Sequence, residues 1–489
     1  MNRNIVVIVS DTFRFDLLHK GFTVKNNIKA RLSSIEKLCS ESIEFTRAYH
    51  ASFPTVPNRA DLFTGMFTFT LYDWSPLPRE WVTLPTVLRK AGYACMMVAD
   101  TPHILKDGYN FDRGFDGWVW IRGQENDRYR TSPADVKLPC SPQKLRSVET
   151  TMQHIRNNYY RRYEEDWIPA KTAMEASRWL EENYRRNFFL YVDFFDPHEP
   201  WDPPRWYVNM YDPCYEGEEV VYPAYGPHNY LTDDELLHIR AMYAGEATMV
   251  DRWIGFLIEK MNSLGLFENT TVFFTSDHGF YLGEHGLIGK SIIMGESQGL
   301  APLYEEVAHI PLLVRFADNL GLRKSIKIGA LVQTPDITAT VLDLAGVKSF
   351  AEASVQGKSL LLLVKGEASS VREMAVSTPS LIKGVRAGLR ATVTTDEWSL
   401  ILAPETSMAE AEKIEVTFIV DGEPRRLKPM GEITTELYNL KSDPKQERNL
   451  VSEETETVKN IQAKFIGFLS ELGAGRETIS PWLKCRGLI

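Results

Sequence analysis

Near its start the chain reads Ile5-Val6-Val7-Ile8-Val9-Ser10-Asp11, a run of β-branched residues followed by a small polar residue and a carboxylate. An apolar run without alternation is typical of a strand buried on both faces of a parallel sheet. Similar runs recur at residues 95–99, 188–194, 272–275 and 311–316. Together they indicate one large sheet with a buried centre.

Helical patterns separate these runs, at residues 29–39, 84–91, 171–184, 246–264 and 335–345, the last with Thr334 placed to cap its start. This alternation predicts an α/β fold with a large, mainly parallel sheet between helices. After residue 375 short alternating segments at 399–402 and 416–420 replace the buried runs, the turn Asp421-Gly422 indicates a hairpin, and a last helix is expected over 454–472. We therefore expect a large α/β domain over residues 1–375 and a smaller antiparallel α+β subdomain over 376–489.

The composition limits the classes of partner. The chain has 489 residues, 44% of them hydrophobic, and a net charge of −10, which argues against a nucleic-acid-binding protein. No apolar run has the length that spans a bilayer, so no membrane partner is expected. The five cysteines form no CxxC motif, and no signal-peptide pattern precedes the first strand. These features predict free thiols and a cytoplasmic location.

A second stretch, Thr55-Val56-Pro57-Asn58-Arg59-Ala60-Asp61-Leu62-Phe63-Thr64-Gly65, predicts a helix that Pro opens and Gly closes. The hydroxyl of Thr55 stands at the helix start, where free N–H groups and the helix dipole favour an anion. Arg59 lies one helical turn later and can share a face with Thr55. The segment is either an ordinary capped helix or a nucleophile with its own anion-binding groups.

Polar side chains follow several of the predicted strands. They are Asp11 and Thr12 after the first, His198 after the run 188–194, Asp277 and His278 after the run 272–275, and then Lys290. Ligands of open α/β sheets bind at the carboxyl ends of the strands, so these side chains are expected to meet at one edge. A single Asp after a strand is more often a helix cap, but three such strand ends together favour a shared site.

These residues include candidates for metal ligands, for a nucleophile and for groups that neutralise charge on the substrate. Carboxylate oxygens and imidazole, from Asp11, Asp277 and His278, suit a divalent cation such as Mn, Ca, Zn or Mg. Such an ion would lower the pKa of the Thr55 hydroxyl. The groups that could neutralise charge on the transferred group are Arg59, Lys290 and His198. The pattern therefore predicts metal-assisted attack by Thr55 on phosphorus or sulfur.

The chain resembles the sulfatase branch of the alkaline phosphatase superfamily over nearly its whole length. The motifs that carry the resemblance are Asp11-Thr12-Phe13-Arg14, residues 57–65, residues 188–204, Ser276-Asp277-His278-Gly279 to Lys290, residues 335–346, and Leu437-Tyr438-Asn439-Leu440 to Leu450. The resemblance implies an alkaline-phosphatase-like sandwich of helices around a sheet, followed by a four-stranded antiparallel subdomain with a helix. It also implies one metal held by Asp11, Asp277 and His278 with the nucleophile oxygen, and contacts of Arg59, His198 and Lys290 with the transferred group.

The chain departs from that family at three positions. Thr55 stands where typical sulfatases have the Cys or Ser that becomes formylglycine, and threonine is not expected to give that aldehyde. A threonine ester lacks the second hydroxyl that expels sulfate, so water must attack the phosphorus or sulfur directly. Thr12 replaces a second Asp ligand and is expected to offer a neutral oxygen to the metal, and His278 replaces an Asn that is common in the family. Phosphonate monoester hydrolases are similar at these last two positions, although they keep the formylglycine.

We therefore predict a metal-dependent hydrolase that cleaves a small phosphate or phosphonate ester through Thr55. The alternatives are a sulfatase, a phosphoryl transferase, and a binding protein without activity.

Two further histidines are expected to contact the substrate. The family's Lys-x-His segment reads Asp100-Thr101-Pro102-His103 in this chain, so the lysine is absent and His103 remains. His285 is expected near the site, against the alternative of a histidine that packs a loop. Two irregular regions, 107–169 and 201–234, are rich in Trp, Tyr, Arg and Pro. They either wall a pocket or form the contact of a homo-oligomer.

Overall fold

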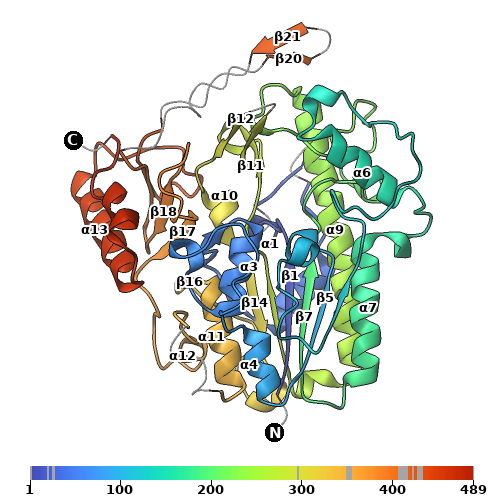
Figure 1. The fold of residues 1–489 in the computed structure, drawn as a ribbon, viewed down its shortest axis with the longest axis vertical. Coiled ribbons are helices and arrows are strands. Elements are labelled where there is room, and N and C mark those ends of the chain that lie inside the picture. Colours follow the sequence, from blue (N-terminus) through green and yellow to red (C-terminus); the bar gives the residue numbers. More distant parts are fainter. Residues whose placement is uncertain are drawn as a thin grey trace.

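The computed structural model describes residues 3–487 except 19–20, 25–27, 295–296, 348–354, 406–416, 421–422 and 427–432. Its centre is an eight-stranded sheet in the order β15-β2-β14-β9-β1-β7-β5-β6 (Figure 1). The strands are β1 (Asn4–Ser10), β2 (Ile43–Phe45), β5 (Ala94–Ala99), β6 (Gly117–Trp120), β7 (Phe188–Phe194), β9 (Thr270–Thr275), β14 (Leu312–Arg315) and β15 (Ile326–Ile328). The five strands from β9 to β6 are parallel, and β14 is antiparallel to both of its neighbours. The predicted α/β fold and mainly parallel sheet are confirmed.

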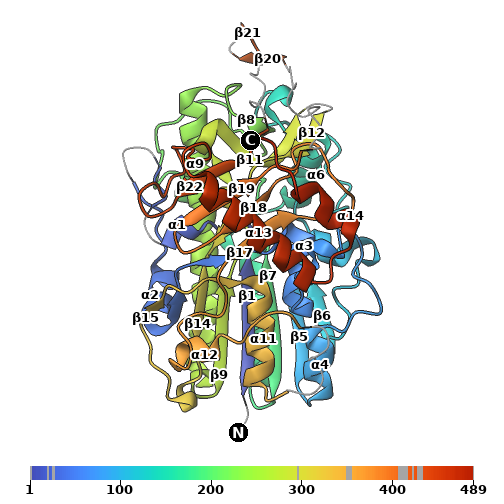
Figure 2. The same ribbon diagram turned by 90° about the vertical axis from the view of Figure 1, so that its left-hand side faces the viewer.

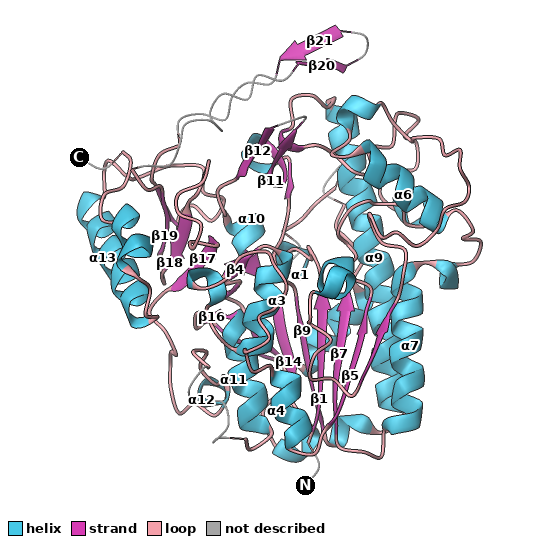
Figure 3. Cartoon of the chain, viewed as in Figure 1, coloured by secondary structure: helices cyan, strands magenta, loops and turns pink. Residues whose placement is uncertain are grey.

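Strand β1 shows no alternation of apolar and polar residues, because helices cover both faces of the sheet. Ile5, Val7 and Val9 pack into one apolar core, and Val6 and Ile8 pack into the other. The first core contains side chains of α3 (Thr55–Thr64), α4 (Leu84–Lys90) and α11 (Thr334–Leu344). The second contains side chains of α2 (Ser33–Glu41), α7 (Ile168–Asn183) and α9 (Asp233–Ser263). Figure 3 shows the resulting three layers, with the strands between two sets of helices.

The C-terminal part forms a second sheet. Its strands β17 (Ala375–Pro379), β18 (Ala391–Thr394), β19 (Trp398–Leu402) and β22 (Glu436–Asn439) are antiparallel, and α13 (Thr455–Glu471) lies across them (Figure 2). This is the four-stranded subdomain with a helix that the resemblance implies. β4 (Ser52–Phe53) adds a fifth strand, parallel to β17, so this sheet reaches the segment that leads into Thr55. The strands β20 (Thr417–Val420) and β21 (Glu423–Arg426) pair as the predicted hairpin, whose turn Asp421-Gly422 and first residue Val416 lie outside the described residues.

Several elements differ from the predicted ones. Helix α9 begins at Asp233, well ahead of residue 246, because Thr232 and Glu235 form a capping box at its start. Helix α11 is capped by Gln333, and Thr334 is its first residue. The two regions expected to be irregular contain β6 and α6 (Val148–Asn158) in the first, and α8 (Arg205–Val208) and β8 (Tyr225–Pro227) in the second.

A small antiparallel sheet, which the sequence patterns did not predict, contains Lys290. It is built from β8, β10 (Tyr281–Leu282), β11 (Leu287–Met294) and β12 (Ser297–Leu300). Lys290 therefore lies within β11 and not at a strand end of the central sheet.

The sequence predicts that the chain has no membrane-spanning segment and that its cysteines are free thiols. None of the helices described combines the length and the apolar character that crossing a bilayer requires. All five cysteines are free, as predicted.

Candidate active site

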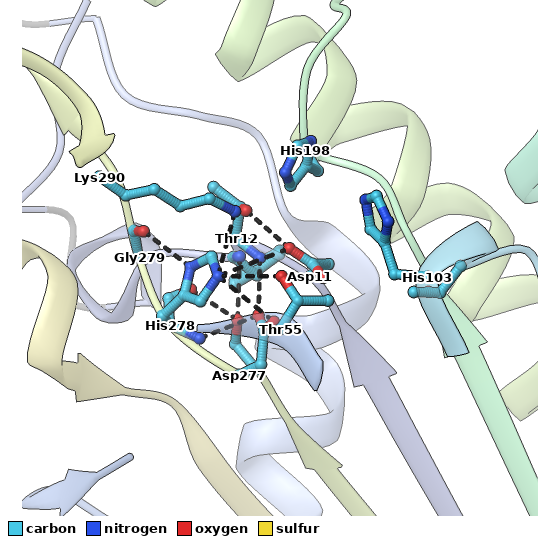
Figure 4. Close-up of polar contacts among 12 residues, drawn as sticks. Asp11, Thr12, Thr55, His103, His198, Asp277, His278, Gly279 and Lys290 are labelled. Carbon is cyan, nitrogen blue, oxygen red and sulfur yellow. Dashed lines mark hydrogen bonds and ion pairs between the residues drawn. The ribbon is translucent and has the colours of Figure 1, made fainter. Parts of the chain in front are cut away.

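Two neighbouring strand ends bring Asp11, Asp277 and His278 together. Strands β1 and β9 run parallel with Val9 opposite Thr275, so the residues that follow them emerge at the same edge. One ligand atom of each of the three side chains lies within 4.8 Å of the other two, and all three residues are buried (Figure 4). The predicted meeting of these strand ends is confirmed.

The ring of His278 is oriented by its own loop. Its Nδ1 lies 3.0 Å from the Gly279 carbonyl oxygen, which places the ring proton on Nδ1 and leaves a lone pair on Nε2. Burial lowers the pKa of His278 well below its ordinary value, so the ring is neutral at neutral pH. A side chain at Gly279 would overlap the Glu306 carbonyl oxygen, so the loop requires glycine there. The Nε2 lone pair faces the cluster, 3.4 Å from Asp277 Oδ2 and 4.0 Å from Asp11 Oδ1.

Arg59 lies between buried carboxylates. Its Nε and Nη2 donate to Asp193 at 3.0 and 2.8 Å, and its Nη1 pairs with Asp277 and, at 3.0 Å, with Asp11. Although burial acts in the opposite direction, the Arg59 guanidinium lowers the pKa of Asp277. Burial and then the neighbouring Asp277 carboxylate raise the pKa of Asp11 well above its ordinary value. The contact of Arg59 with the transferred group stays a prediction.

The cluster fits a divalent cation. Three buried carboxylates lie around the Arg59 guanidinium, and even with the Lys290 ammonium group nearby this leaves an excess of negative charge that is costly to bury. Asp11 Oδ2 forms the ion pair with Arg59 Nη1, but it accepts no hydrogen bond of regular geometry from the described residues. Carboxylate oxygen and neutral imidazole are ligands that Mn, Zn and the harder divalent cations accept. Asp11, Asp277 and His278 are therefore the residues that would hold the ion.

Thr12 supports this carboxylate pair. Its backbone N–H donates to Asp277 Oδ1 at 3.1 Å, and its hydroxyl donates to Asp11 Oδ1 at 2.8 Å. Its backbone adopts the left-handed conformation, with φ of 62°, and this turn carries both donors toward the carboxylates. Whether the Thr12 oxygen is also a metal ligand stays a prediction.

Thr55 is the first residue of α3 and is buried. Its hydroxyl oxygen lies 3.5 Å from His278 Nε2, so the helix start points into the cluster. The helix ends at Gly65, whose φ of 71° is the left-handed cap that the sequence predicts, whereas Pro57 is its third residue and not its first.

Lys290 reaches the cluster from β11, on the side of His278 away from the central sheet (Figure 4). Its Nζ lies 3.1 Å from His278 Nε2, and burial lowers the pKa of its ammonium group. The structure therefore gathers the predicted nucleophile, the predicted ligands and one predicted cation around a single imidazole nitrogen.

His198 and His103 lie side by side at the edge of this cluster (Figure 4). His198 follows β7, and its Nδ1 donates to the Glu199 carbonyl oxygen at 2.6 Å. His103 follows β5, and its Nε2 lies 2.9 Å from Glu125 Oε2. Burial lowers the pKa of both imidazoles, and for His198 the second cause is Lys290.

A buried network behind the two histidines was missed from the sequence. Arg146 pairs with Glu199 at 2.8 Å and with Glu125 at 2.9 Å, and its guanidinium lies over the rings of Tyr222 and Tyr225. Each glutamate also approaches one histidine, so Arg146 links the supports of both rings. Glu125 and Arg146 lie in the region 107–169, which shows no motif, and Asp193 lies inside an apolar strand. Only Glu199, next to His198, carried a signal that sequence reasoning could have used.

The change Glu125→Gln tests this network. It keeps the shape of the side chain but removes the negative charge beside His103. We expect kcat/KM to fall about tenfold to a hundredfold, the range for partners that orient functional histidines. The pH profile should also shift, because Glu125 is the charge that favours a protonated His103. Steady-state kinetics across pH would measure both effects, with the exposed Glu165→Gln as the matched control; equal profiles for the two variants would contradict the positioning role.

His285 has other partners. Its Nε2 lies 3.2 Å from Glu306 Oε2, and its ring stacks on Tyr304 at 3.8 Å. It lines a separate cavity of about 790 Å³ together with Arg14, Glu305 and His309. Among the described contacts none joins His285 to the cluster around His278.

Comparisons with known proteins agree with this geometry. A sulfatase family model matches residues 3–347. An arylsulfatase from Clostridium perfringens is 26% identical over 426 residues, covering 76% of this chain and 80% of the relative. The multifunctional alkaline phosphatase superfamily protein PehA from Trinickia caryophylli is 23% identical over 427 residues, covering 76% and 79%. The crystal structure of a phosphonate monoester hydrolase from Agrobacterium radiobacter has a TM-score of 0.68 at 18% identity and covers 96% of each chain. The family match spans all of the strand ends and the helix that build the cluster.

Proposed function

The chain belongs to the sulfatase family and is a hydrolase of ester bonds, and we propose that it cleaves a small phosphate or phosphonate ester with Thr55 as its nucleophile. The observation that carries the proposal is the position of the Thr55 hydroxyl, 3.5 Å from His278 Nε2 at the buried Asp11–Asp277–His278 cluster. Threonine is not expected to form the aldehyde on which sulfate release from a formylglycine depends. Direct attack of water on phosphorus does not need that aldehyde.

The proposed reaction has two steps. In the first, Thr55 gives its hydroxyl proton to solvent and its oxygen forms a bond to phosphorus, the bond from phosphorus to the leaving oxygen breaks, and the leaving oxygen takes a proton from an imidazole. In the second, a water oxygen bonds to phosphorus and gives one proton back to the imidazole, the bond to Thr55 breaks, and the Thr55 oxygen regains a proton from solvent. A divalent ion held by Asp11, Asp277 and His278, with Thr12 beside them, would polarise the ester and favour the ionised Thr55 hydroxyl.

The remaining site residues receive roles from their positions. Lys290 neutralises charge on the transferred group, His198 contacts that group, and Arg59 holds the carboxylates and the start of α3 in place. His103, backed by Glu125, donates the proton to the leaving oxygen, because the carboxylate counteracts the lowering of the His103 pKa by burial. We assign no substrate contact to His285. All of these residues belong to the proposed catalytic domain 1–375, and residues 376–489 form the proposed subdomain.

Sulfate-ester hydrolysis is the second candidate. Membership of the sulfatase family and the similarity to an arylsulfatase favour it. The same cluster could bind a sulfate ester, and Thr55 could form the corresponding sulfate intermediate. The two candidates differ in the step that releases Thr55.

A substrate panel separates the two. The purified protein would be stripped of metal and supplied separately with Mn, Ca, Zn and Mg, then assayed with an aryl sulfate, an aryl phosphodiester and an aryl phosphonate. We expect turnover of the phosphorus esters to exceed that of the sulfate by at least about tenfold in kcat/KM, a difference of roughly 1.4 kcal/mol in transition-state stabilisation. Turnover of the sulfate alone would overturn the choice of phosphorus. No turnover of any ester with any metal would contradict hydrolysis and favour a binding protein without activity.

A further inference from the structure

Trp74 lies against His103 and has no role in the reaction proposed above. It belongs to the loop between α3 and α4, and its ring meets the His103 ring with the centroids 5.1 Å apart and an interplanar angle of 73°. Aromatic rings prefer this edge-to-face arrangement. Trp74 therefore stands beside the imidazole that protonates the leaving oxygen in the proposed reaction.

Trp74 differs from the other neighbours of His103 in its exposure. The His103 ring also packs against Phe195, with the centroids 5.6 Å apart, and its Nε2 lies 2.9 Å from Glu125 Oε2. Phe195 and Glu125 are buried, whereas Trp74 is half-buried. Of these three neighbours, only Trp74 offers accessible surface to a group bound beside His103.

The indole N–H of Trp74 is a second free feature. It forms no hydrogen bond with any acceptor in the part of the chain that the structure describes. The indole N–H groups of Trp167, Trp201 and Trp253, by contrast, donate to protein oxygens at 2.9, 2.8 and 3.1 Å. Tryptophan in a folded protein usually finds a partner for this group, so Trp74 retains a donor for a ligand.

Contacts on both sides of Trp74 hold its loop in place. The preceding residue, Asp73, pairs with Lys383 at 2.7 Å and with Arg386 at 3.7 Å, both from the loop between β17 and β18. Leu77, three residues after Trp74, is buried in the apolar core that contains side chains of α3. A ring whose backbone is fixed before binding loses less conformational entropy when a ligand packs on it.

A half-exposed indole with a free N–H suits a ring that has a flat, weakly polar face and a hydrogen-bond acceptor. An ester whose leaving oxygen meets His103 carries its alcohol past Trp74. We propose that Trp74 packs against the ring of that alcohol, an aromatic ring or a sugar ring, and thereby determines specificity for the alcohol side of the ester. The inference rests on the proposed function, because it takes His103 as the group at the leaving oxygen, and it narrows the substrate class to esters of ring alcohols.

The test compares ring alcohols with an acyclic alcohol and measures binding. The Thr55→Ala protein, loaded with Mn, would be titrated by calorimetry with the phenyl, glucose-6-yl and hexafluoroisopropyl esters of methylphosphonic acid, and with the same three esters of sulfuric acid. Phenol and hexafluoroisopropanol have similar acidity, so their esters differ chiefly in the ring. The variant is Trp74→Ala in the same background. Its matched control is Trp81→Ala, because Trp81 lies in the same loop, is half-buried against the same core, and packs on Tyr72 with the ring centroids 5.5 Å apart.

We expect Trp74→Ala to weaken binding of the ring esters about tenfold, through lost stacking and lost burial of ring surface, and to leave the hexafluoroisopropyl ester unchanged. Trp81→Ala should change none of them. Loss confined to the phenyl esters assigns an aromatic ring to the alcohol, and loss confined to the glucose esters assigns a sugar ring.

Three results would overturn the role of Trp74: equal loss for ring and acyclic esters, equal loss in both variants, or no loss for any ring ester, which includes the failure of every ring ester to bind. The proposed function fails separately. If wild-type protein hydrolysed none of these esters while Trp74→Ala selectively lost the ring esters, hydrolysis would be contradicted and the role of Trp74 would stand. Selective loss seen with the sulfates alone would support the second candidate function and the same role of Trp74.

Discussion

Replacement of Thr55 with alanine is expected to lower kcat on the best ester substrate by at least about 10³-fold, because removal of a covalent nucleophile is among the most damaging single changes in an enzyme. The hydroxyl is buried at the start of α3 and faces the lone pair of His278 Nε2. No other described hydroxyl side chain forms a hydrogen bond with that nitrogen. KM should change much less than kcat, since the binding cations remain.

The control for this variant is Thr64→Ala. Thr64 lies on the same helix and is also buried, but its hydroxyl donates to the Ala60 carbonyl oxygen and not toward the cluster. Thr55→Ser should retain measurable activity because it keeps a nucleophilic oxygen. Rapid quenching and mass spectrometry of wild-type protein should find the transferred group on the peptide that contains Thr55. Full activity of Thr55→Ala would show that the nucleophile is another group.

Only part of the structure of the Thr55 segment could be predicted from its sequence. The left-handed end at Gly65 follows from glycine's freedom at positive φ and was predictable. The complete burial of the helix was not predictable. Every residue from Thr55 to Thr64 is buried, although Asn58, Arg59 and Asp61 are polar. Asp61 accepts from Ser52 and Thr68 nearby. Asn58 and Arg59 are satisfied by Thr334 and Asp193, far along the chain, and such pairs leave no local pattern.

The metal-ligand residues were predictable for a different reason. The carboxyl ends of parallel strands meet at one edge of the sheet, so the predicted fold already implied that Asp11 and Asp277 lie close together. Lys290 approaches from a separate antiparallel sheet, and its position depends on how that sheet packs above the edge. The supports of His103 and His198 depend on a contact between Arg146 and two glutamates from distant loops. Periodicity and motif spacing contain no information on such contacts.

Asp277→Asn should abolish tight binding of a divalent ion and with it most of the activity. The change removes one of two ligand carboxylates and keeps the side chain's size. We expect metal affinity to fall at least about a hundredfold and kcat to fall about 10³-fold, since the ion supplies several kcal/mol of transition-state stabilisation. Metal content after gel filtration, and calorimetric titration of the stripped protein, would measure the first effect.

The matched control is Asp193→Asn, because the structure separates the two functions of these carboxylates. Asp193 and Asp277 are both fully buried and both pair with Arg59, so either change leaves the guanidinium partly unpaired at a similar cost in folding. Only Asp277 belongs to the group that could hold a metal. Added metal should therefore raise the Tm of Asp193→Asn as it does for wild-type protein, by mass action on the folded state, and should leave the Tm of Asp277→Asn unchanged. If both variants lost the metal-dependent rise equally, Arg59 pairing and not ligation would explain the effect, and the assignment of Asp277 as a ligand would be wrong.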